Sequence, residues 1–146
     1  MKVIGPSHED FWDRANKIVE IYNEESSVPF SELLDVSNSN TINLIYIDGI
    51  DGGVITDAWY NKNDEFLFHS IMYAAFPKAD RQKGYLKACV NSVNFKIETV
   101  QINAGDPVEI WKKLGFKKLG LLNFTMMLRT RDFDGVNWGL VVLKKM

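Results

Sequence analysis

Cysteine is almost absent from this chain, since Cys89 is the only one among 146 residues. A single thiol cannot close an intramolecular disulfide, so nothing indicates an oxidising compartment, and a cysteine-based metal cluster is excluded. An excess of charge is missing too, because 17 Lys and Arg against 19 Asp and Glu leave a net charge of -2. Non-specific nucleic-acid binding needs a basic surface, so we do not expect nucleic acid as a partner. A local basic patch stays compatible with this balance.

Long hydrophobic runs are also missing. No apolar stretch approaches the roughly 20 residues that span a bilayer. The segment Met1–Pro6 is too short for a signal peptide, and the polar residues His8, Glu9 and Asp10 follow it at once. We therefore expect no membrane partner and a cytoplasmic enzyme or binding protein. The chain is 46% hydrophobic and shows no repeat or linker, so it predicts a single domain over residues 1–146.

The hydrophobic pattern predicts helices and strands in a defined order. A first helix is expected from Ser7, its N-cap, to about Tyr22, with a stop near Glu25–Ser27. Further helices are expected at Phe30–Val36, Gly84–Phe95 and Pro107–Leu114, the last ended by Gly115 as C-cap. Strands are expected at Thr41–Asp48, Val54–Tyr60, Glu65–Phe76, Ile97–Ile102, Phe116–Leu128 and Trp138–Leu143. The strand–helix–strand unit from Glu65 to Ile102 makes its two strands parallel. The predicted fold class is α/β (α+β), with a mixed sheet, one parallel strand pair and about four flanking helices.

One loop combines features of an anion site. The predicted strand ends at Phe76-Pro77, a polar loop follows, and a helix opens at Gly84. Free backbone N–H groups and the positive dipole end at a helix start favour a diphosphate. Arg81 and Lys83 add positive charge, and Gly84 lets a ligand approach the backbone closely. Taken alone, a solvated loop before an ordinary amphipathic helix explains the segment equally well.

The same loop resembles the phosphate signature of the GNAT (GCN5-related N-acetyltransferase) superfamily, Gln/Arg-x-x-Gly-x-Gly/Ala. Here it reads Arg81-Gln82-Lys83-Gly84-Tyr85-Leu86. A second similarity is Trp111-Lys112-Lys113-Leu114-Gly115-Phe116, where that superfamily often has a Tyr-x-x-Leu-Gly-Phe-like run. The predicted strand order agrees as well. The resemblance implies an acyl-CoA-dependent N-acyltransferase that moves acetyl from acetyl-CoA to a primary amine, with no metal.

The resemblance also implies where the cofactor lies. The strand end offers backbone groups to the pantetheine arm, the N–H groups of Gln82–Leu86 hold the pyrophosphate, and the two parallel strands splay apart to admit the thioester. The implied cofactor-binding residues are Ala74, Ala75, Phe76, Arg81, Gln82, Lys83, Gly84, Tyr85, Leu86, Asn103 and Trp111.

The chain departs from that superfamily at three positions. Leu86 replaces a small residue, and its branched side chain either crowds the pyrophosphate or turns into the core. As the first member of an apolar stripe it is expected to turn into the core. Ser70, expected on one face with Met72 and Ala74, stands where a glutamate base is common, and serine is a poor base. Trp111 replaces a tyrosine acid, and indole is no acid at useful pH.

The neighbouring His69 has a suitable pKa for a base, but regular strand alternation turns it to the opposite face unless a bulge rotates it inward. Ser70 and His69 are thus the catalytic candidates. The alternative function is a catalytically degenerate module that binds coenzyme A or a protein partner. The amine acceptor, and association into a homodimer through strand edges, are left open by the sequence.

Overall fold

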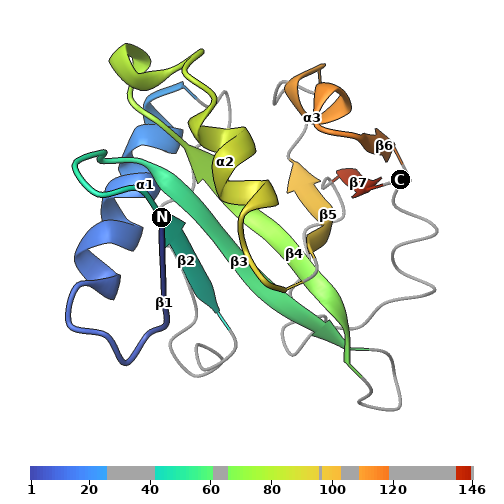
Figure 1. Ribbon diagram of the computed structural model, residues 1–146, viewed down its shortest axis with the longest axis horizontal. Coiled ribbons are helices and arrows are strands. Elements are labelled where there is room, and N and C mark those ends of the chain that lie inside the picture. Colours follow the sequence, from blue (N-terminus) through green and yellow to red (C-terminus); the bar gives the residue numbers. More distant parts are fainter. Residues whose placement is uncertain (26–41, 61–65, 96, 103–108, 119–140, 146) are drawn as a thin grey trace.

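The computed structural model describes residues 1–25, 42–60, 66–95, 97–102, 109–118 and 141–145 (Figure 1). In chain order the elements are β1 (Lys2–Ile4), α1 (Phe11–Glu25), β2 (Asn43–Tyr46), β3 (Gly53–Tyr60), β4 (Phe66–Ala75), a short 3₁₀ turn η2 (Lys78–Asp80), α2 (Tyr85–Asn91), β5 (Ile97–Ile102), α3 (Glu109–Lys113), β6 (Phe116–Lys118) and β7 (Val141–Lys145). The predicted helix at Phe30–Val36 lies outside the described residues.

The strands form one sheet in the order β1-β2-β3-β4-β5-β7-β6. Strands β1 to β4 are an antiparallel block in which each strand pairs with the next along the chain. Strands β5, β7 and β6 are antiparallel as well. Parallel pairing is confined to β4 and β5, through His69↔Ile97, Ser70↔Thr99 and Ile71↔Val100.

This topology corrects the predicted fold class. The protein is a small α+β domain whose four leading strands form an all-antiparallel block, where the prediction was an α/β (α+β) class with a GNAT-like mixed sheet. The described residues contain three α-helices, and the other expected helix, Phe30–Val36, lies outside them. The physical reason is the connectivity: β2, β3 and β4 follow one another directly along the chain, and antiparallel strands need no crossover helix. Strand β1 was not predicted.

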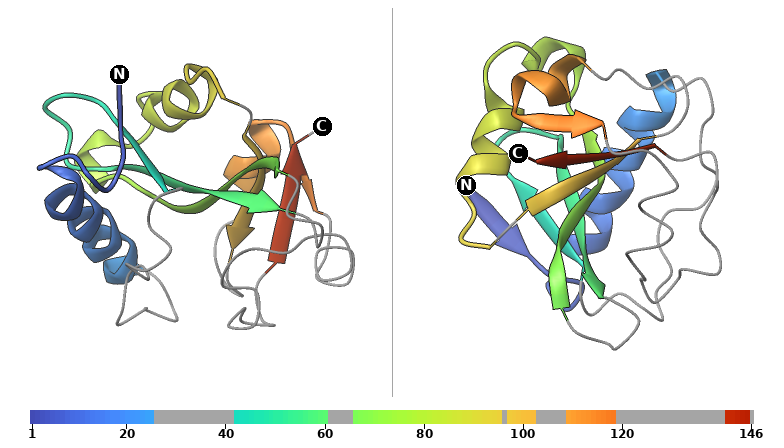
Figure 2. Two further views of the ribbon diagram at one scale, coloured as in Figure 1. Left: turned by 90° about the horizontal axis from the view of Figure 1, so that it is seen from below. Right: turned by 90° about the vertical axis from the view of Figure 1, so that its right-hand side faces the viewer.

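Helices cover both faces of the sheet, with α1 on one face and α2 on the other (Figure 2). The α1-side core consists of Ile4, Phe11, Ala15, Ile18, Val19, Ile42, Leu44, Tyr46, Ile55 and Tyr73. The α2-side core consists of Ile45, Val54, Ile71, Phe76, Cys89, Val90, Ile97, Val100, Trp111 and Phe116. Each large apolar side chain that is fully buried contributes about 1.5–3 kcal/mol, so the two cores hold the sheet between its helices.

A bulge in β4 changes which face its side chains occupy. Ile55 pairs with Tyr73 and the next residue, Thr56, pairs with Ile71, so Met72 is an extra residue in β4. Ile71 packs in the α2-side core, whereas Met72 and Tyr73 both pack on the α1 side. The bulge therefore interrupts the regular alternation of β4.

Two helix boundaries differ from prediction. The N–H of Arg14 donates to the carbonyl of Asp10 over 3.1 Å, so α1 begins after Asp10 and Ser7 is not its N-cap. Its last residue, Glu25, agrees with the predicted stop near Glu25–Ser27. Helix α2 ends at Asn91, four residues before the predicted Phe95, with the N–H of Ser92 donating to the carbonyl of Ala88 over 3.0 Å.

The C-terminal elements confirm one prediction and correct others. Gly115 follows α3 with φ +97°, and its N–H donates to the carbonyl of Lys112 over 3.0 Å, which confirms the predicted glycine cap. Strand β7 covers the described part of the predicted Trp138–Leu143 strand and continues two residues further, to Lys145. The described part of the predicted Phe116–Leu128 strand is β6. No helix in the described part of the chain is long and apolar enough to cross a membrane.

Candidate functional site

The site lies where the paired strands β4 and β5 diverge. Their ladder ends at Ile71↔Val100, although β4 continues to Ala75 and β5 to Ile102. Beyond Ile71, β4 pairs with β3 through Ala74↔Val54 and Ala75↔Gly53, and β5 pairs with β7. A cleft of about 500 Å³ occupies the place where the two strands diverge.

The cleft is lined from both faces of the sheet. Its α1 wall consists of Ile21, Tyr22, Met72, Tyr73 and Ala75. Its α2 wall consists of Phe76, Tyr85, Leu86, Trp111 and Leu114. A third group, the basic rim, consists of Arg81, Lys87 and Lys113. A ligand in this cleft thus contacts two apolar walls and a cationic edge.

The loop after β4 is shaped by Pro77 and Arg81. Pro77 has φ −55° and leads into the 3₁₀ turn, where the N–H of Asp80 donates to the Pro77 carbonyl over 2.8 Å. The Nε of Arg81 donates back to the carbonyl of Phe76 over 2.9 Å. This bond ties the loop to the strand end, so the guanidinium is held at the mouth of the cleft.

Two residues of the loop have left-handed backbone. Gln82 has φ +61° and Gly84 has φ +80°. A non-glycine residue in this region costs about 1 kcal/mol, and such strain clusters at binding sites. A Cβ added to Gly84 would meet no atom of the described residues within 4 Å, so the space beside this backbone is open on their side. A ligand can therefore approach the main chain here.

Helix α2 begins directly after Gly84. The carbonyl of Gly84 accepts from the N–H of Ala88 over 2.9 Å, which closes the first helical turn. The N–H groups of the residues in between, Tyr85–Lys87, have no acceptor inside the helix. All three residues line the cleft. The first turn of α2 thus brings donor groups to the wall next to the basic rim.

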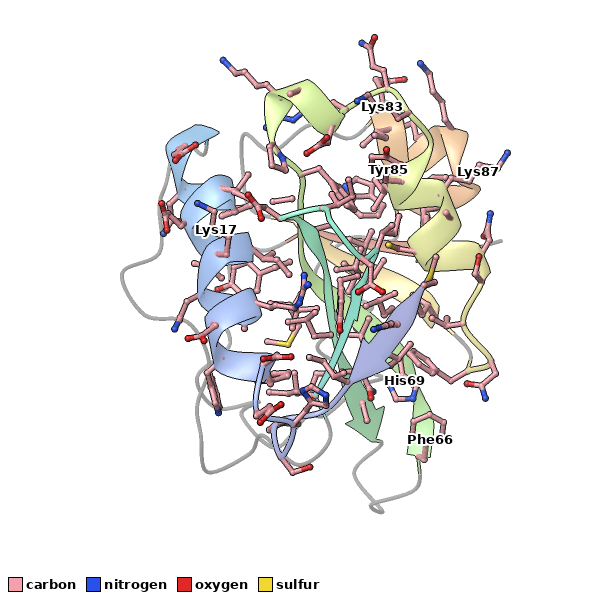
Figure 3. All side chains as sticks on the ribbon, turned by 60° about the vertical axis from the view of Figure 1, so that its left-hand side comes forward. Lys17, Phe66, His69, Lys83, Tyr85 and Lys87 are labelled. Atoms are coloured by element: carbon pink, nitrogen blue, oxygen red, sulfur yellow. The ribbon has the colours of Figure 1, made fainter. Side chains whose placement is uncertain are left out.

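The charge around the cleft is predominantly positive. Among the described residues that line it, Asp80 is the only carboxylate, and its Oδ1 lies 3.9 Å from the Nζ of Lys83. Lys83 itself is exposed and does not line the cleft. Figure 3 shows Lys83, Tyr85 and Lys87 together at one end of the molecule, with His69 and Phe66 at the other. A protein of net charge -2 therefore has a local cationic edge at this cleft.

Most residues predicted to bind the cofactor meet at the cleft. Those that line it are Ala74, Ala75, Phe76, Arg81, Gln82, Gly84, Tyr85, Leu86 and Trp111. Asn103 lies outside the described residues. Leu86 packs against the α2-side core, as expected for the first residue of its apolar stripe. Trp111 is buried and lies perpendicular to Phe116, with 5.8 Å between ring centroids.

The two catalytic candidates lie elsewhere. Ser70 is fully buried, pairs with Asp57 across the sheet and does not line the cleft. The predicted shared face of Ser70, Met72 and Ala74 is wrong for Ala74, because the bulge places Ala74 with the α2-side core and Met72 with the α1-side core.

His69 also lies away from the cleft. Its ring centroid is 4.4 Å from that of Phe95 and 5.3 Å from that of Phe66. Burial lowers the pKa of His69 below its usual value. Its buried Nδ1 has no hydrogen-bond partner among the described residues. The bulge at Met72 does not bring this imidazole to the cleft.

Sequence reasoning missed the tyrosine pair of the α1 wall. Tyr22 and Tyr73 meet edge to face, with ring centroids 5.6 Å apart and planes at 82°. Burial, with a smaller contribution from Tyr22, raises the pKa of Tyr73 to about 12. Tyr22 was visible as the last apolar position of the first predicted helix. Tyr73 gave no signal, because its side of the sheet depends on the bulge.

Within the described ranges, no group of three or more His, Cys, Asp or Glu side chains is arranged to hold a metal ion. A scan against protein-family models finds no match, and a search of curated proteins finds no similar sequence.

Proposed function

We propose that the protein is an N-acetyltransferase that moves acetyl from acetyl-CoA to a primary amine. The observation that carries this proposal is the cleft between the diverging ends of β4 and β5, with a cationic rim at its mouth. The similarity of Arg81–Leu86 and Trp111–Phe116 to GNAT motifs supports it from the sequence side.

The cleft suits the two chemically different parts of coenzyme A. Beyond Ile71, β4 no longer pairs with β5, so its edge can pair with the amide groups of a pantetheine arm as an added strand would. The basic rim and the open backbone at Gly84 suit the anionic diphosphate, since guanidinium and ammonium groups form short, strong hydrogen bonds with phosphate oxygens. The strand end and the basic rim are adjacent in the protein, and the pantetheine arm and the diphosphate are adjacent in coenzyme A.

The transfer itself makes few demands on the protein. The amine nitrogen attacks the thioester carbonyl carbon, the carbon–sulfur bond breaks, and amide and thiol are the products. The thioester is already activated, so holding the two reactants in contact contributes much of the rate. The apolar walls exclude water from the reacting carbonyl.

A second candidate function is favoured by Ser70 and Trp111. The serine is buried away from the cleft and the tryptophan carries no acidic proton, so no usual base or acid of the superfamily lines the cleft at these positions. Under this alternative the protein binds coenzyme A without transferring acetyl.

Two measurements separate these functions. Titration calorimetry with coenzyme A, and with AMP as a control that lacks the pantetheine arm, measures binding. Thiol release from acetyl-CoA in the presence of small amines, peptides and protein N-termini measures transfer. Binding with turnover supports the acetyltransferase, and binding without turnover supports the second candidate. Absence of coenzyme A binding overturns both.

A further inference from the structure

The α1 wall of the cleft is aromatic and apolar. Tyr22 and Tyr73 form its centre through their edge-to-face contact, and Ile21 and Met72 flank them. Asp80, the one carboxylate among the described lining residues, belongs to the loop at the basic rim and lies beside Lys83. A cationic amine at the α1 wall would therefore leave water without gaining a carboxylate partner among the described lining residues, which is costly.

A general base is also missing from the described lining residues. His69 and Ser70 do not reach the cleft. The pKa of Tyr73 is raised to about 12 by burial, so its hydroxyl stays protonated at neutral pH and cannot accept a proton. An alkylamine with the pKa of a lysine side chain is neutral in only about one molecule in 2,500 at pH 7. Such an acceptor would need a base, and the lining residues that the structure describes offer none.

We infer that the acceptor is a weakly basic aromatic amine, its nitrogen bonded directly to the ring, held against Tyr22 and Tyr73. This inference rests on the proposed acetyl transfer. The nitrogen of such an amine is uncharged at neutral pH, because its lone pair is delocalised into the ring. It enters the cleft without desolvating a charge, and an aromatic ring packs edge to face or offset on tyrosine. Its lone pair forms the new C–N bond, the C–S bond breaks, and the nitrogen's proton passes to the departing thiolate, giving an anilide and free coenzyme A.

The test uses two isomeric amines. 4-Methylaniline and benzylamine have the same atoms and the same ring, but only the first has its nitrogen on the ring. With the full chain and saturating acetyl-CoA at pH 7, we expect kcat/KM for 4-methylaniline to exceed that for benzylamine by at least tenfold, after subtraction of the uncatalysed rate. Spermidine serves as the polycationic comparison and is expected to be the poorest acceptor.

The pH profile provides an independent readout. The rate with 4-methylaniline is expected to stay flat between pH 6.5 and 8.5, because the amine is neutral throughout. The rate with benzylamine is expected to rise about tenfold per pH unit, following its neutral fraction. Preference for benzylamine or spermidine at pH 7, or coenzyme A binding with no turnover of any of the three, overturns the inference. Absence of coenzyme A binding overturns the proposed function itself, so the two failures are distinguishable.

Paired variants locate the acceptor on the α1 wall. Tyr22→Leu removes one ring of the tyrosine pair and is expected to raise the KM for 4-methylaniline about fivefold, as loss of an aromatic contact does. Tyr85→Leu removes a ring from the α2 wall and is expected to change the Kd for coenzyme A more than the KM for the amine. The reverse pattern, or equal effects of the two variants on both ligands, contradicts the placement.

Discussion

The substitution Gly84→Ala tests whether the open space at this position is needed for ligand binding rather than for folding. The Cβ of Gly84→Ala would meet no atom of the described part of the chain within 4 Å, so the substitution creates no clash there. The backbone cost is that of placing an L-residue at φ +80°, about 1 kcal/mol. Gly49 is a matched control: its φ is +83°, its Cβ would also meet none of the described residues within 4 Å, and it does not line the cleft. Gly84→Ala and Gly49→Ala are therefore expected to lower the free energy of unfolding equally.

Their effects on ligand binding should differ. If the diphosphate lies against the open backbone at Gly84, the new methyl group pushes it away from at least one N–H donor. A hydrogen bond to a charged group contributes about 1.5–3 kcal/mol, so the Kd for coenzyme A is expected to rise about 10- to 100-fold. Gly49→Ala should leave this Kd unchanged, because its methyl group faces open solvent space away from the cleft.

Urea unfolding measures the stability of the two variants, and titration calorimetry measures their Kd for coenzyme A. Equal losses of stability with a rise in Kd confined to Gly84→Ala support a ligand at this backbone. Equal losses of stability with identical coenzyme A affinities would refute the reasoning, since the space beside Gly84 would then be unused. A larger loss of stability for Gly84→Ala would show that the space beside it is not open.

Three further outcomes are expected. The pKa of Tyr73 is raised from 10.0 to about 12, so its contribution to the free energy of unfolding is full below pH 10 and falls by about 2–3 kcal/mol as the pH rises to 12. Tyr73→Phe should lessen this fall, and an unchanged dependence of the unfolding free energy on pH contradicts the prediction. Cys89 is buried and its pKa is raised to about 11, so it should react with a thiol reagent at pH 8 only in denaturant; rapid labelling of the native protein contradicts this. Arg81→Lys removes the Nε bond to the Phe76 carbonyl and should cost about 1 kcal/mol in urea unfolding, against no change if that bond contributes nothing.

Local patterns predicted much of this fold. The apolar positions Phe11, Ala15, Ile18 and Val19 recur at helical spacing, and all four are buried in the α1-side core. Pro77 and Gly84 mark the end of β4 and the start of α2 because each restricts or frees the backbone in a known way. Arg81, Tyr85 and Leu86 were placed at one site because a strand end and a helix start must adjoin across a short loop.

Other features depend on interactions between distant segments. The N-terminal strand β1 has only three residues, and it pairs with the distant β2 through Ile4↔Leu44, both of which are buried in the α1-side core. The early end of α2 at Asn91 is not marked by glycine or proline. The face occupied by Tyr73 cannot be predicted by counting along β4, since regular alternation would place it beside Ile71. A strand bulge is fixed by pairing, and pairing is not visible in one strand's sequence.

That bulge also accounts for the cleft. Its extra residue, Met72, directly follows Ile71, which is the last residue of β4 to pair with β5. A bulge bends its strand and increases the local twist, so β4 turns away from β5 at the point where the ladder ends. The same extra residue sends Tyr73 to the α1 side, beside Tyr22. The opening between the strands and the aromatic wall that faces it thus have one origin, the insertion of a single residue in β4.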